Sequence, residues 1–262
     1  MRLKVMTDAA MAASAAILKF DPTMLKAQVK SSEGDFVTAA DIGSQQAIVD
    51  IIKAAYPDDL IISEEMTEGQ QLLTPGNLPQ LTGWVIDPLD GTNNFKKDMA
   101  YSGVSIAYIE NGEAVIGVVY NPYRKELYQA RKGSGATRGG QPIHVSDAVS
   151  FNAGTRVCTS NSYEGGTQAN LERYAHLGEV WVDVLGSSVL IMTDVASGRL
   201  DLYHHNGLKP WDNAAAFLIA QEAGAKITDL SGKPTTWLSS EVVMGNTPLV
   251  NEFIAKTLSP PR

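Results

Sequence analysis

The segment from Trp84 to Phe95 restricts the possible folds of this 262-residue chain more than any other stretch. It opens with apolar residues that are typical of a buried strand, and this strand is expected to end at Asp87. A sharp turn follows, because Pro88 disfavours helical backbone at the residue before it and Gly91 frees the backbone after it. We therefore expect a buried sheet with two acids, Asp87 and Asp90, at the end of one strand.

The two acids and the turn after them have the composition of a site for a cation and a phosphate. Carboxylate oxygens with no Cys or His beside them favour Mg²⁺ over Zn²⁺. The N–H groups of Gly91, Thr92 and Asn93 open a helix-like sequence, where such groups are unpaired and attract an anion. A purely structural interpretation remains open, because acids in an Asp-Pro-x-Asp-Gly sequence are also common turn and N-cap residues.

The rest of the chain predicts a mixed α/β protein. The first half is expected to be rich in antiparallel strands, because Asn111 and Gly112 between two apolar runs are a strong hairpin signal. The second half alternates strands with helices. The expected helices are Ala9–Leu18 with an end near Phe20, Asp41–Ala55, Gln168–Ala175, Ser187–Ala196 and Trp211–Ala223. The expected strands are Leu60–Ile62, Trp84–Asp87, Tyr101–Ile109, Ala114–Tyr120, Glu126–Ala130, Thr155–Thr159, Glu179–Val184 and Leu200–Tyr203.

No linker or repeat divides the sequence, so we expect a single domain over residues 1–262 with two lobes. The lobe of about residues 1–147 is expected to be antiparallel-rich and to carry the metal site. The lobe of about residues 148–262 is expected to be α/β.

Charge and cysteine content exclude several classes of partner. The chain has 29 Asp and Glu against 21 Lys and Arg, a formal net charge of −8, which argues against nucleic acid or an anionic membrane surface. The apolar stretch Ala9–Leu18 is about half as long as the roughly 20 residues that a membrane span needs. Cys158 is the only cysteine, so no internal disulfide is possible and a reducing compartment, the cytoplasm, is expected.

Three motifs in one order extend this interpretation. They are Ile62-Ser63-Glu64-Glu65, the segment Asp87–Phe95, and Trp211-Asp212 followed by Ala214-Ala215. Over about residues 30–232 they resemble the inositol monophosphatase family of Mg²⁺-dependent, lithium-sensitive sugar and polyol phosphatases. The resemblance implies a layered αβαβα sandwich of the inositol monophosphatase and fructose-1,6-bisphosphatase type, and a homodimer.

The resemblance implies that two or three Mg²⁺ ions are bound by the side chains of four acids and by one carbonyl. These ligands are Glu64, Asp87, the carbonyl of Leu89, Asp90 and Asp212. Position alone gives simpler alternatives, since Asp212 could be the N-cap of a helix and Glu64 a solvated acid at a strand end.

The resemblance also implies how water is activated. Asp41 and Thr92 match the residues that position and deprotonate the attacking water, and Glu64 belongs with them as a metal-binding catalytic residue. Lys30 matches a basic residue on a mobile loop near the site. An exposed loop lysine is the alternative for Lys30.

Substrate contacts are implied for residues of both halves of the chain. They are Asp90, Gly91, Thr92, Asn93, Gly186, Ser187, His205 and Asp212. His205 stands where inositol-preferring members carry an acid, and Asp98 and Ala100 replace a Gly and a Pro that often follow the motif. His204 and His205 are expected at a strand end on opposite faces, as ordinary edge residues or, for His205, in the substrate pocket.

The function implied is a Mg²⁺-dependent phosphomonoesterase that uses a metal-activated water, with myo-inositol 1-phosphate as the expected substrate. Fructose 1,6-bisphosphate, histidinol phosphate and 3′-phosphoadenosine nucleotides are alternatives within the same fold. A non-catalytic relative that binds phosphate or a partner is the alternative from another class.

Overall fold

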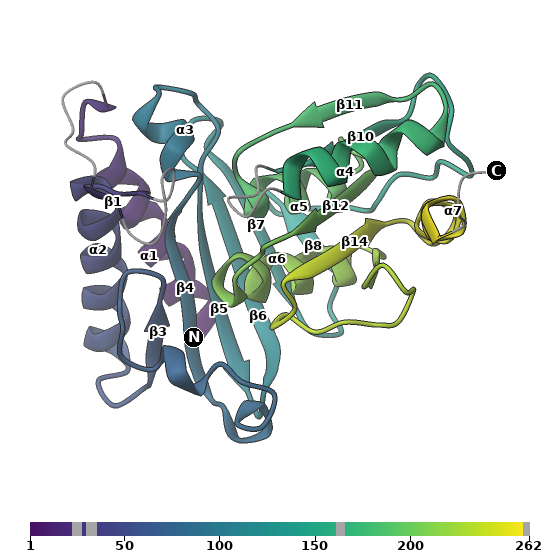
Figure 1. The fold of residues 1–262 in the computed structure, drawn as a ribbon. Coiled ribbons are helices and arrows are strands. Elements are labelled where there is room, and N and C mark those ends of the chain that lie inside the picture. The colour runs from purple at the N-terminus through teal and green to yellow at the C-terminus, as the bar shows by residue number, and fades with distance from the viewer. Residues whose placement is uncertain (23–27, 30–35, 161–165, 259–262) are drawn as a thin grey trace.

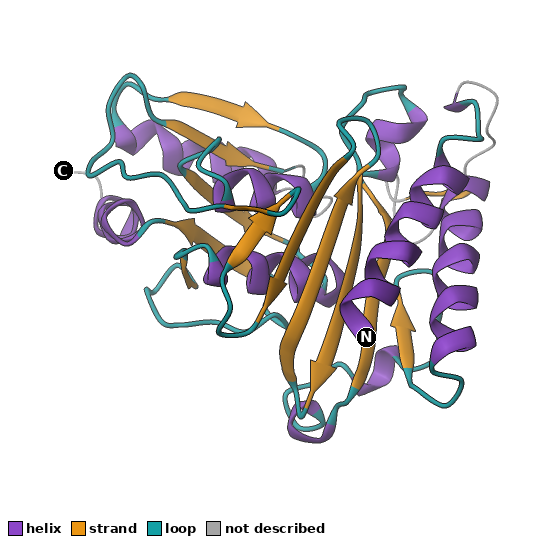
Figure 2. Ribbon diagram, turned by 180° about the vertical axis from the view of Figure 1, so that it is seen from behind, coloured by secondary structure: helices purple, strands orange, loops and turns teal. Residues whose placement is uncertain are grey.

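The computed structural model describes residues 1–22, 28–29, 36–160 and 166–258, and these form a sandwich of alternating helical and sheet layers (Figures 1 and 2). Helices α1 and α2 cover one face of a seven-stranded sheet, and α5 and α6 cover its other face. The opposite side of α5 and α6 packs on a five-stranded sheet, whose outer face carries α4 and α7. The αβαβα sandwich predicted from the resemblance is therefore confirmed.

Seven α-helices lie in the described residues. They are α1 (Arg2–Ile17), α2 (Ala39–Ala55), α3 (Thr92–Lys96), α4 (Gly166–Tyr174), α5 (Ser188–Ala196), α6 (Pro210–Glu222) and α7 (Thr247–Leu258). Short 3-10 turns occur at Gln70–Leu72, Leu78–Gln80 and Ala175–Leu177.

The seven-stranded sheet belongs to the first half of the chain. Its order is β3 (Ile61–Ser63), β4 (Gly83–Asp90), β5 (Gly103–Glu110), β6 (Glu113–Asn121), β7 (Glu126–Arg131), β8 (Ala136–Arg138) and β9 (Gln141–Pro142). Only the β3–β4 pair is parallel. The predicted hairpin is present, and its turn residues Asn111 and Gly112 both have positive φ, which matches the right-handed twist of the flanking strands.

The five-stranded sheet belongs to the second half. Its order is β11 (Trp181–Val184), β10 (Arg156–Thr159), β12 (Leu202–Asn206), β14 (Glu241–Gly245) and β13 (Lys226–Thr228). Strands β10, β11 and β12 are parallel, so their carboxyl ends lie at one edge of the sheet. A separate two-stranded ribbon joins β1 (Gln28–Val29) to β2 (Phe36–Val37).

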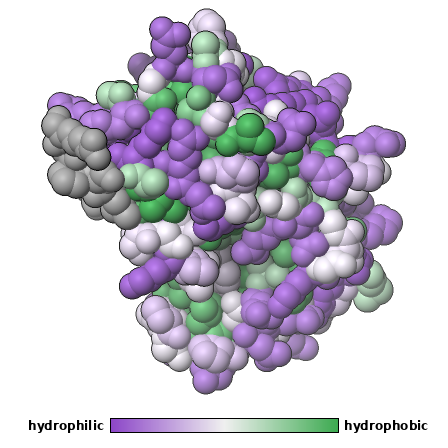
Figure 3. Space-filling model, turned by 90° about the vertical axis from the view of Figure 1, so that its right-hand side faces the viewer, coloured by the Kyte–Doolittle hydropathy of each residue, from purple (hydrophilic) through white to green (hydrophobic). Residues whose placement is uncertain are grey.

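The middle helices explain why the two sheets are held together. Every residue of α5 is buried, and so is the stretch Asn213–Ala220 of α6. A helix that is apolar all round needs cover on all sides, which two facing sheets supply. On the outside, the face of the molecule that carries α7 is mostly hydrophilic, with hydrophobic side chains in small groups (Figure 3).

Several predicted boundaries were wrong. The first helix begins at Arg2, seven residues earlier than expected, because Met6 continues its buried face while Lys4 and Asp8 lie on its exposed side. The strand that was expected to end at Asp87 continues to Asp90. Strands β8, β9, β13 and β14 and helix α7 were not predicted. None of the helices in the described ranges has the length and apolar character needed to cross a membrane.

Candidate functional site

A bulge in β4 brings Asp87 and Asp90 to the same side of the sheet. Asp87 pairs with Ser105 of β5 and Asp90 with Gly103, so three steps along β4 match two steps along β5. In a regular strand, residues three apart point to opposite faces, and the extra residue of a bulge cancels this alternation. Pro88 lies inside the bulge, where its missing N–H removes no ladder hydrogen bond.

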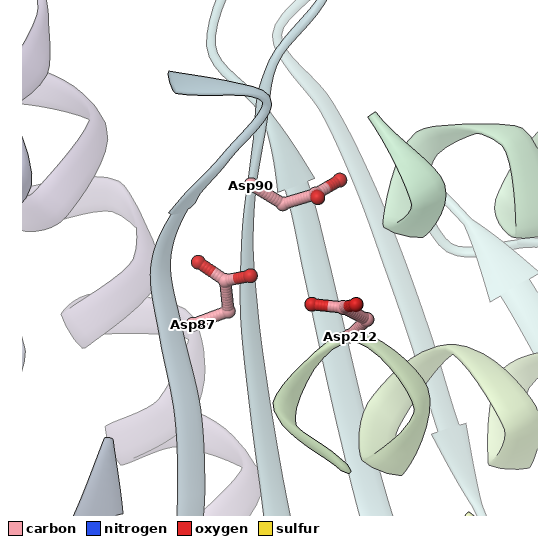
Figure 4. A group of neighbouring side chains, drawn as sticks. All are labelled: Asp87, Asp90 and Asp212. Carbon is pink, nitrogen blue, oxygen red and sulfur yellow. The ribbon is translucent and has the colours of Figure 1, made fainter. Parts of the chain in front are cut away.

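Asp212 reaches the same place from the second half of the chain. It is the third residue of α6, and its Oδ2 accepts a hydrogen bond from the N–H of Lys209 at 2.9 Å, which closes the start of the helix. The predicted role at a helix start is thus present, although Asp212 stands inside the helix and not at the N-cap. Its carboxylate also faces Asp87 and Asp90 (Figure 4).

The three aspartates form a cluster that suits a cation. One carboxylate oxygen from each lies within 4.8 Å of the others. Burial raises the pKa of Asp90 to about 7, and it raises the pKa of Asp212 well above its usual value, with the charges of Asp90 and Glu64 adding to the effect at Asp212. Acids this close resist ionisation together unless a cation lies between them, and an all-oxygen ligand set matches Mg²⁺.

Glu64 lies beside this cluster. It follows β3 directly, and its N–H donates to the carbonyl of Ile86 at 3.3 Å, which continues the pairing of β3 with β4. Its charge contributes to the raised pKa values of Asp90 and Asp212. The structure therefore brings together the four acids that the resemblance grouped.

Asp41 and Thr92 are in direct contact. The hydroxyl of Thr92 lies 2.7 Å from Asp41 Oδ1 and 3.1 Å from the carbonyl oxygen of Leu89. Asp41 Oδ2 accepts from the N–H and hydroxyl of Thr38, at 2.8 and 2.5 Å, and so caps the start of α2. The Asp41 side chain is fully buried and fixed at both oxygens, a capping role that the sequence analysis did not predict.

The turn at Gly91 is pressed against the turn at Gly186. Gly91 has φ +87°, and a Cβ on it would lie 3.0 Å from the carbonyl oxygen of Gly186. A Cβ on Gly186 would in turn lie 2.6 Å from Asn94 Oδ1. Among the described residues none accepts a hydrogen bond from the N–H of Gly91, Thr92 or Asn93, as the sequence predicted for an anion site.

Ser187 was predicted to bind substrate, but in the structure it contacts an acid. Its hydroxyl donates to Asp90 Oδ2, and the N–H of Val189 donates to the same oxygen at 2.9 Å. The Ser187 side chain is fully buried. This partnership was not predicted, and its only signal in the sequence is a Gly-Ser-Ser turn before an apolar helix.

The prediction that His204 and His205 are edge residues was wrong. Both are buried on β12, which lies inside the five-stranded sheet. They do point to opposite faces, since His204 packs on Phe253 of α7 while His205 stacks on Tyr203, which belongs to the core between the sheets. Burial lowers the pKa of His204 to about 3 and that of His205 to about 4, so both rings are neutral.

The ring of His205 lies among buried polar side chains, an arrangement that the sequence analysis did not predict. Its Nδ1 lies 3.4 Å from Asn170 Nδ2 and 3.5 Å from Thr159 Oγ1, at the carboxyl ends of β10 and β12. Lys30 lies outside the described residues.

Comparisons with known proteins show which family this chain resembles. The family model described as the inositol monophosphatase family matches residues 2–260. An inositol-1-monophosphatase of Synechocystis is 35% identical over 248 residues, 93% of this chain and 84% of that protein. A fructose-1,6-bisphosphatase/inositol-1-monophosphatase of Thermotoga maritima is 35% identical over 234 residues, covering 88% and 85%.

A second kind of name also occurs among the relatives. The Nus factor SuhB of Escherichia coli is 35% identical over 240 residues, 89% of this chain and 86% of that protein. Among solved structures, the extragenic suppressor protein suhB from Bartonella henselae superposes with a TM-score of 0.89 at 27% identity and covers 99% of both chains.

Proposed function

The chain belongs to the inositol monophosphatase family, and on that premise we propose that it is a Mg²⁺-dependent phosphomonoesterase. Its proposed substrate is a small polyol or sugar phosphate, most specifically myo-inositol 1-phosphate. The observation that carries this proposal is the contact between Asp41 and Thr92. The Thr92 hydroxyl lies 2.7 Å from Asp41 Oδ1 and also contacts the carbonyl of Leu89, beside the three clustered aspartates. Asp41 Oδ2 caps α2, but the contact of Oδ1 with the Thr92 hydroxyl adds a pair able to move a proton, which phosphate binding alone does not need.

The residues that would hold two or three Mg²⁺ ions are Glu64, Asp87, Asp90, Asp212 and the carbonyl of Leu89. When bound, Mg²⁺ lowers the pKa of a coordinated water and neutralises charge on the phosphate. The chain itself supplies hydrogen-bond donors, because the N–H groups of Gly91, Thr92 and Asn93 have no acceptor in the described part of the chain and can bind phosphate oxygens.

Thr92 and Asp41 would orient and deprotonate the attacking water. The Thr92 hydroxyl has one hydrogen, which it donates to Asp41 Oδ1, so its oxygen is free to accept a hydrogen bond from water. As the water oxygen bonds to phosphorus, its proton passes to Thr92 Oγ1 while the hydroxyl proton of Thr92 moves to Asp41 Oδ1. The phosphorus–oxygen bond to the alcohol breaks on the opposite side, and the departing oxygen takes up a proton from solvent water. Phosphate and the alcohol are released, and Asp41 returns its proton to solvent.

The alcohol part of the substrate is proposed to contact Gly186 and His205, at the carboxyl ends of β11 and β12, together with Asp90 and Asp212. Ligands in α/β sheets bind beyond the carboxyl ends of the strands, which supports this assignment. A neutral His205 in place of an acid would tolerate a more anionic substrate, so fructose 1,6-bisphosphate, histidinol phosphate and a 3′-phosphoadenosine nucleotide stay as alternatives.

A phosphate-release assay over these four substrates, with and without Mg²⁺, tests the proposal. We expect Mg²⁺-dependent release, fastest with myo-inositol 1-phosphate, and inhibition by Li⁺. Asp90→Asn should abolish both Mg²⁺ binding and hydrolysis, while Asp98→Asn, at an exposed position near the site, should leave both in place. Release from none of the substrates would refute an enzymatic function and favour a binding protein.

The remaining expectations concern partners and location. The Nus factor name describes the Escherichia coli relative, and the net charge of −8 supports our proposal that this chain contacts neither nucleic acid nor a membrane surface. A cytoplasmic location stays a prediction from the single cysteine.

We also propose a homodimer that uses strand β11. This strand lies at the edge of its sheet, and Trp181, Val182 and Val184 are 66%, 43% and 41% exposed. An apolar edge strand readily pairs with another edge, and a second copy supplies an identical one. Light scattering should show a dimer for the wild type and a monomer for Trp181→Asp. A wild-type monomer would contradict the proposal.

A further inference from the structure

The donor hydrogen of the Ser187 hydroxyl is used within the protein. This hydrogen is donated to Asp90 Oδ2, and the hydroxyl oxygen accepts from the N–H of Leu190 at 3.4 Å, as the N-cap of α5. A serine hydroxyl has a single donor hydrogen, so none is left for a substrate oxygen. The contact joins residues 97 positions apart in the chain, one at the end of β4 and the other at the start of α5.

Asp90 is held through one of its two oxygens. Ser187 Oγ and the N–H of Val189, at 2.9 Å, both donate to Oδ2. Among the described residues none donates to Oδ1, so this oxygen is available to a cation. Two donors on one oxygen fix the χ2 angle of Asp90, whose carboxylate lies beside those of Asp87 and Asp212 (Figure 4).

Ser187 itself cannot swing away. It is fully buried, and a Cβ built on Gly91 would lie 3.1 Å from Ser187 Cβ, which shows how closely the two turns approach. Helix α5, which begins directly after it, is buried between the two sheets. The donor therefore has one orientation, set by packing on all sides.

We propose that Ser187 is a positioning residue that aims Asp90 at the cation and does not bind substrate. The proposal rests on the proposed function only in taking Asp90 as a metal ligand. Partners behind a metal ligand commonly change metal affinity by about 10- to 100-fold when removed. Ser187 would have an effect of that size although it never touches the cation.

Calorimetric titration with MgCl₂ and with MnCl₂, without substrate, tests this proposal in the full chain. We expect Ser187→Ala to weaken cation binding by about 10-fold or more, and Ser187→Thr, which keeps the hydroxyl, to restore most of it. Ser188→Ala is the matched control, because the neighbouring hydroxyl lies 3.0 Å from Tyr203 Oη and does not contact Asp90. Its cation affinity should equal that of the wild type.

Thermal unfolding distinguishes the positioning role of Ser187 from a purely structural role. Loss of the N-cap in Ser187→Ala lowers Tm with and without cation alike. Loss of positioning also reduces the rise in Tm that saturating Mg²⁺ produces, because weaker binding stabilises less. Ser187→Cys, which keeps the side-chain volume with a weak donor, gives the same comparison if the alanine variant does not fold.

The outcomes distinguish this proposal from the proposed function. Equal cation affinity in the wild type, Ser187→Ala and Ser187→Cys, with only KM raised, would overturn it and return Ser187 to the substrate site. A wild type that binds Mg²⁺ more tightly than Ser187→Ala but hydrolyses no phosphate ester would support the positioning role and refute the enzymatic one. A wild type that binds no divalent cation would refute both.

Discussion

Asp90 shows most clearly how single residues are constrained in this molecule. Burial favours the protonated carboxyl and raises its pKa to about 7, while the hydrogen bonds from Ser187 and Val189 oppose that rise. The site therefore disfavours its own charge unless a cation is present. The ionisation of Asp90 should therefore show in how cation affinity and stability depend on pH.

Cation affinity should fall as the pH is lowered through 7. A cation needs the carboxylate, and below pH 7 the cation-free protein holds a proton on Asp90 that must be displaced. We expect Mg²⁺ binding at pH 6 to be up to about tenfold weaker than at pH 7.5. Proton release should make the binding enthalpy measured by calorimetry depend on the ionisation enthalpy of the buffer. Affinity independent of pH would contradict the raised pKa.

The raised pKa of Asp90 affects stability in the opposite direction, because the stability of the cation-free protein falls as the pH rises. The pKa of Asp90 is higher in the folded state than in the unfolded chain, so the stabilising proton is lost as the pH rises from about 4 through 7. The cation-free wild type should therefore lose stability over this range. Cation-free Asp90→Asn, whose amide carries no charge, should lose less, which parallel urea titrations at pH 5 and 8 would show.

His204 is a second buried residue whose surroundings disfavour its polar side chain. Neither of its ring nitrogens has a hydrogen-bond partner in the described part of the chain, and it packs among apolar side chains. An unpaired buried polar group costs about 1–3 kcal/mol, so His204→Leu should stabilise the protein by about 1 kcal/mol. His144→Leu, at an exposed position, is the control and should change stability little.

The pH dependence of this gain follows from the pKa of His204. The pKa is about 3 in the folded state against 6.5 in the unfolded chain, so stability is lost as the pH falls below 6.5. His204→Leu removes this loss, and its advantage over the wild type should grow between pH 7 and pH 5. An advantage that shrinks toward acid pH would contradict the assignment.

At the scale of elements, the site depends on short irregularities at the ends of regular structure. The bulge in β4 turns Asp87 and Asp90 to one side, and the first turn of α6 presents Asp212. The left-handed residue Gly91 then redirects the chain into α3. Each irregularity is held by a neighbouring element, so element ends and not element centres carry the chemistry.

Gly91→Ala tests the fit between two of these ends. The substitution adds a Cβ at 3.0 Å from the Gly186 carbonyl oxygen in a backbone conformation with φ +87°. We expect a loss of stability of about 1–3 kcal/mol and a loss of hydrolysis, since the Gly91 and Gly186 turns must move apart. Gly133→Ala is the matched control, because its φ of +75° is similar but its Cβ meets nothing within 4 Å. Equal losses in Gly91→Ala and Gly133→Ala would show that the positive φ, and not the contact with Gly186, causes the effect.

At the scale of the whole molecule, helices α5 and α6 pack against both sheets. Their buried side chains form one continuous core with residues of both sheets, so neither sheet keeps its inner cover if the other unfolds. The single domain predicted from the sequence is on this basis proposed to unfold as a unit.

Coincident unfolding of the two sheets would test this proposal. Single-tryptophan variants that keep either Trp84, on β4, or Trp181, on β11, report on the seven-stranded and the five-stranded sheet respectively. We expect equal urea midpoints for the two probes in cation-free protein. Midpoints that differ beyond error would indicate lobes that unfold separately.

Much of the fold could be predicted because its signals are local. The hairpin at Asn111 and Gly112, the helix ends near Gly198 and Gly224, and the apolar strand before Asp87 depend on turn and cap preferences within a few residues. Helix α7 has a local start signal that was missed, since Asn246 Oδ1 accepts a hydrogen bond from the N–H of Leu249 at 3.0 Å, whereas the unpredicted strands β8, β9 and β13 have only two or three residues. Their formation depends on neighbours that the sequence does not identify.

What the sequence determined by itself was the set of chemically able residues, since acids, glycines and a threonine at motif spacing can be recognised without coordinates. Only the tertiary structure decided which of them meet and through which atoms. It placed Ser187 on Asp90 and not in a substrate pocket, fixed Asp41 to both Thr38 and Thr92, and buried His205 inside a sheet. The physical reason is that turns and caps are set by near neighbours along the chain, whereas these partners are set by how distant layers pack.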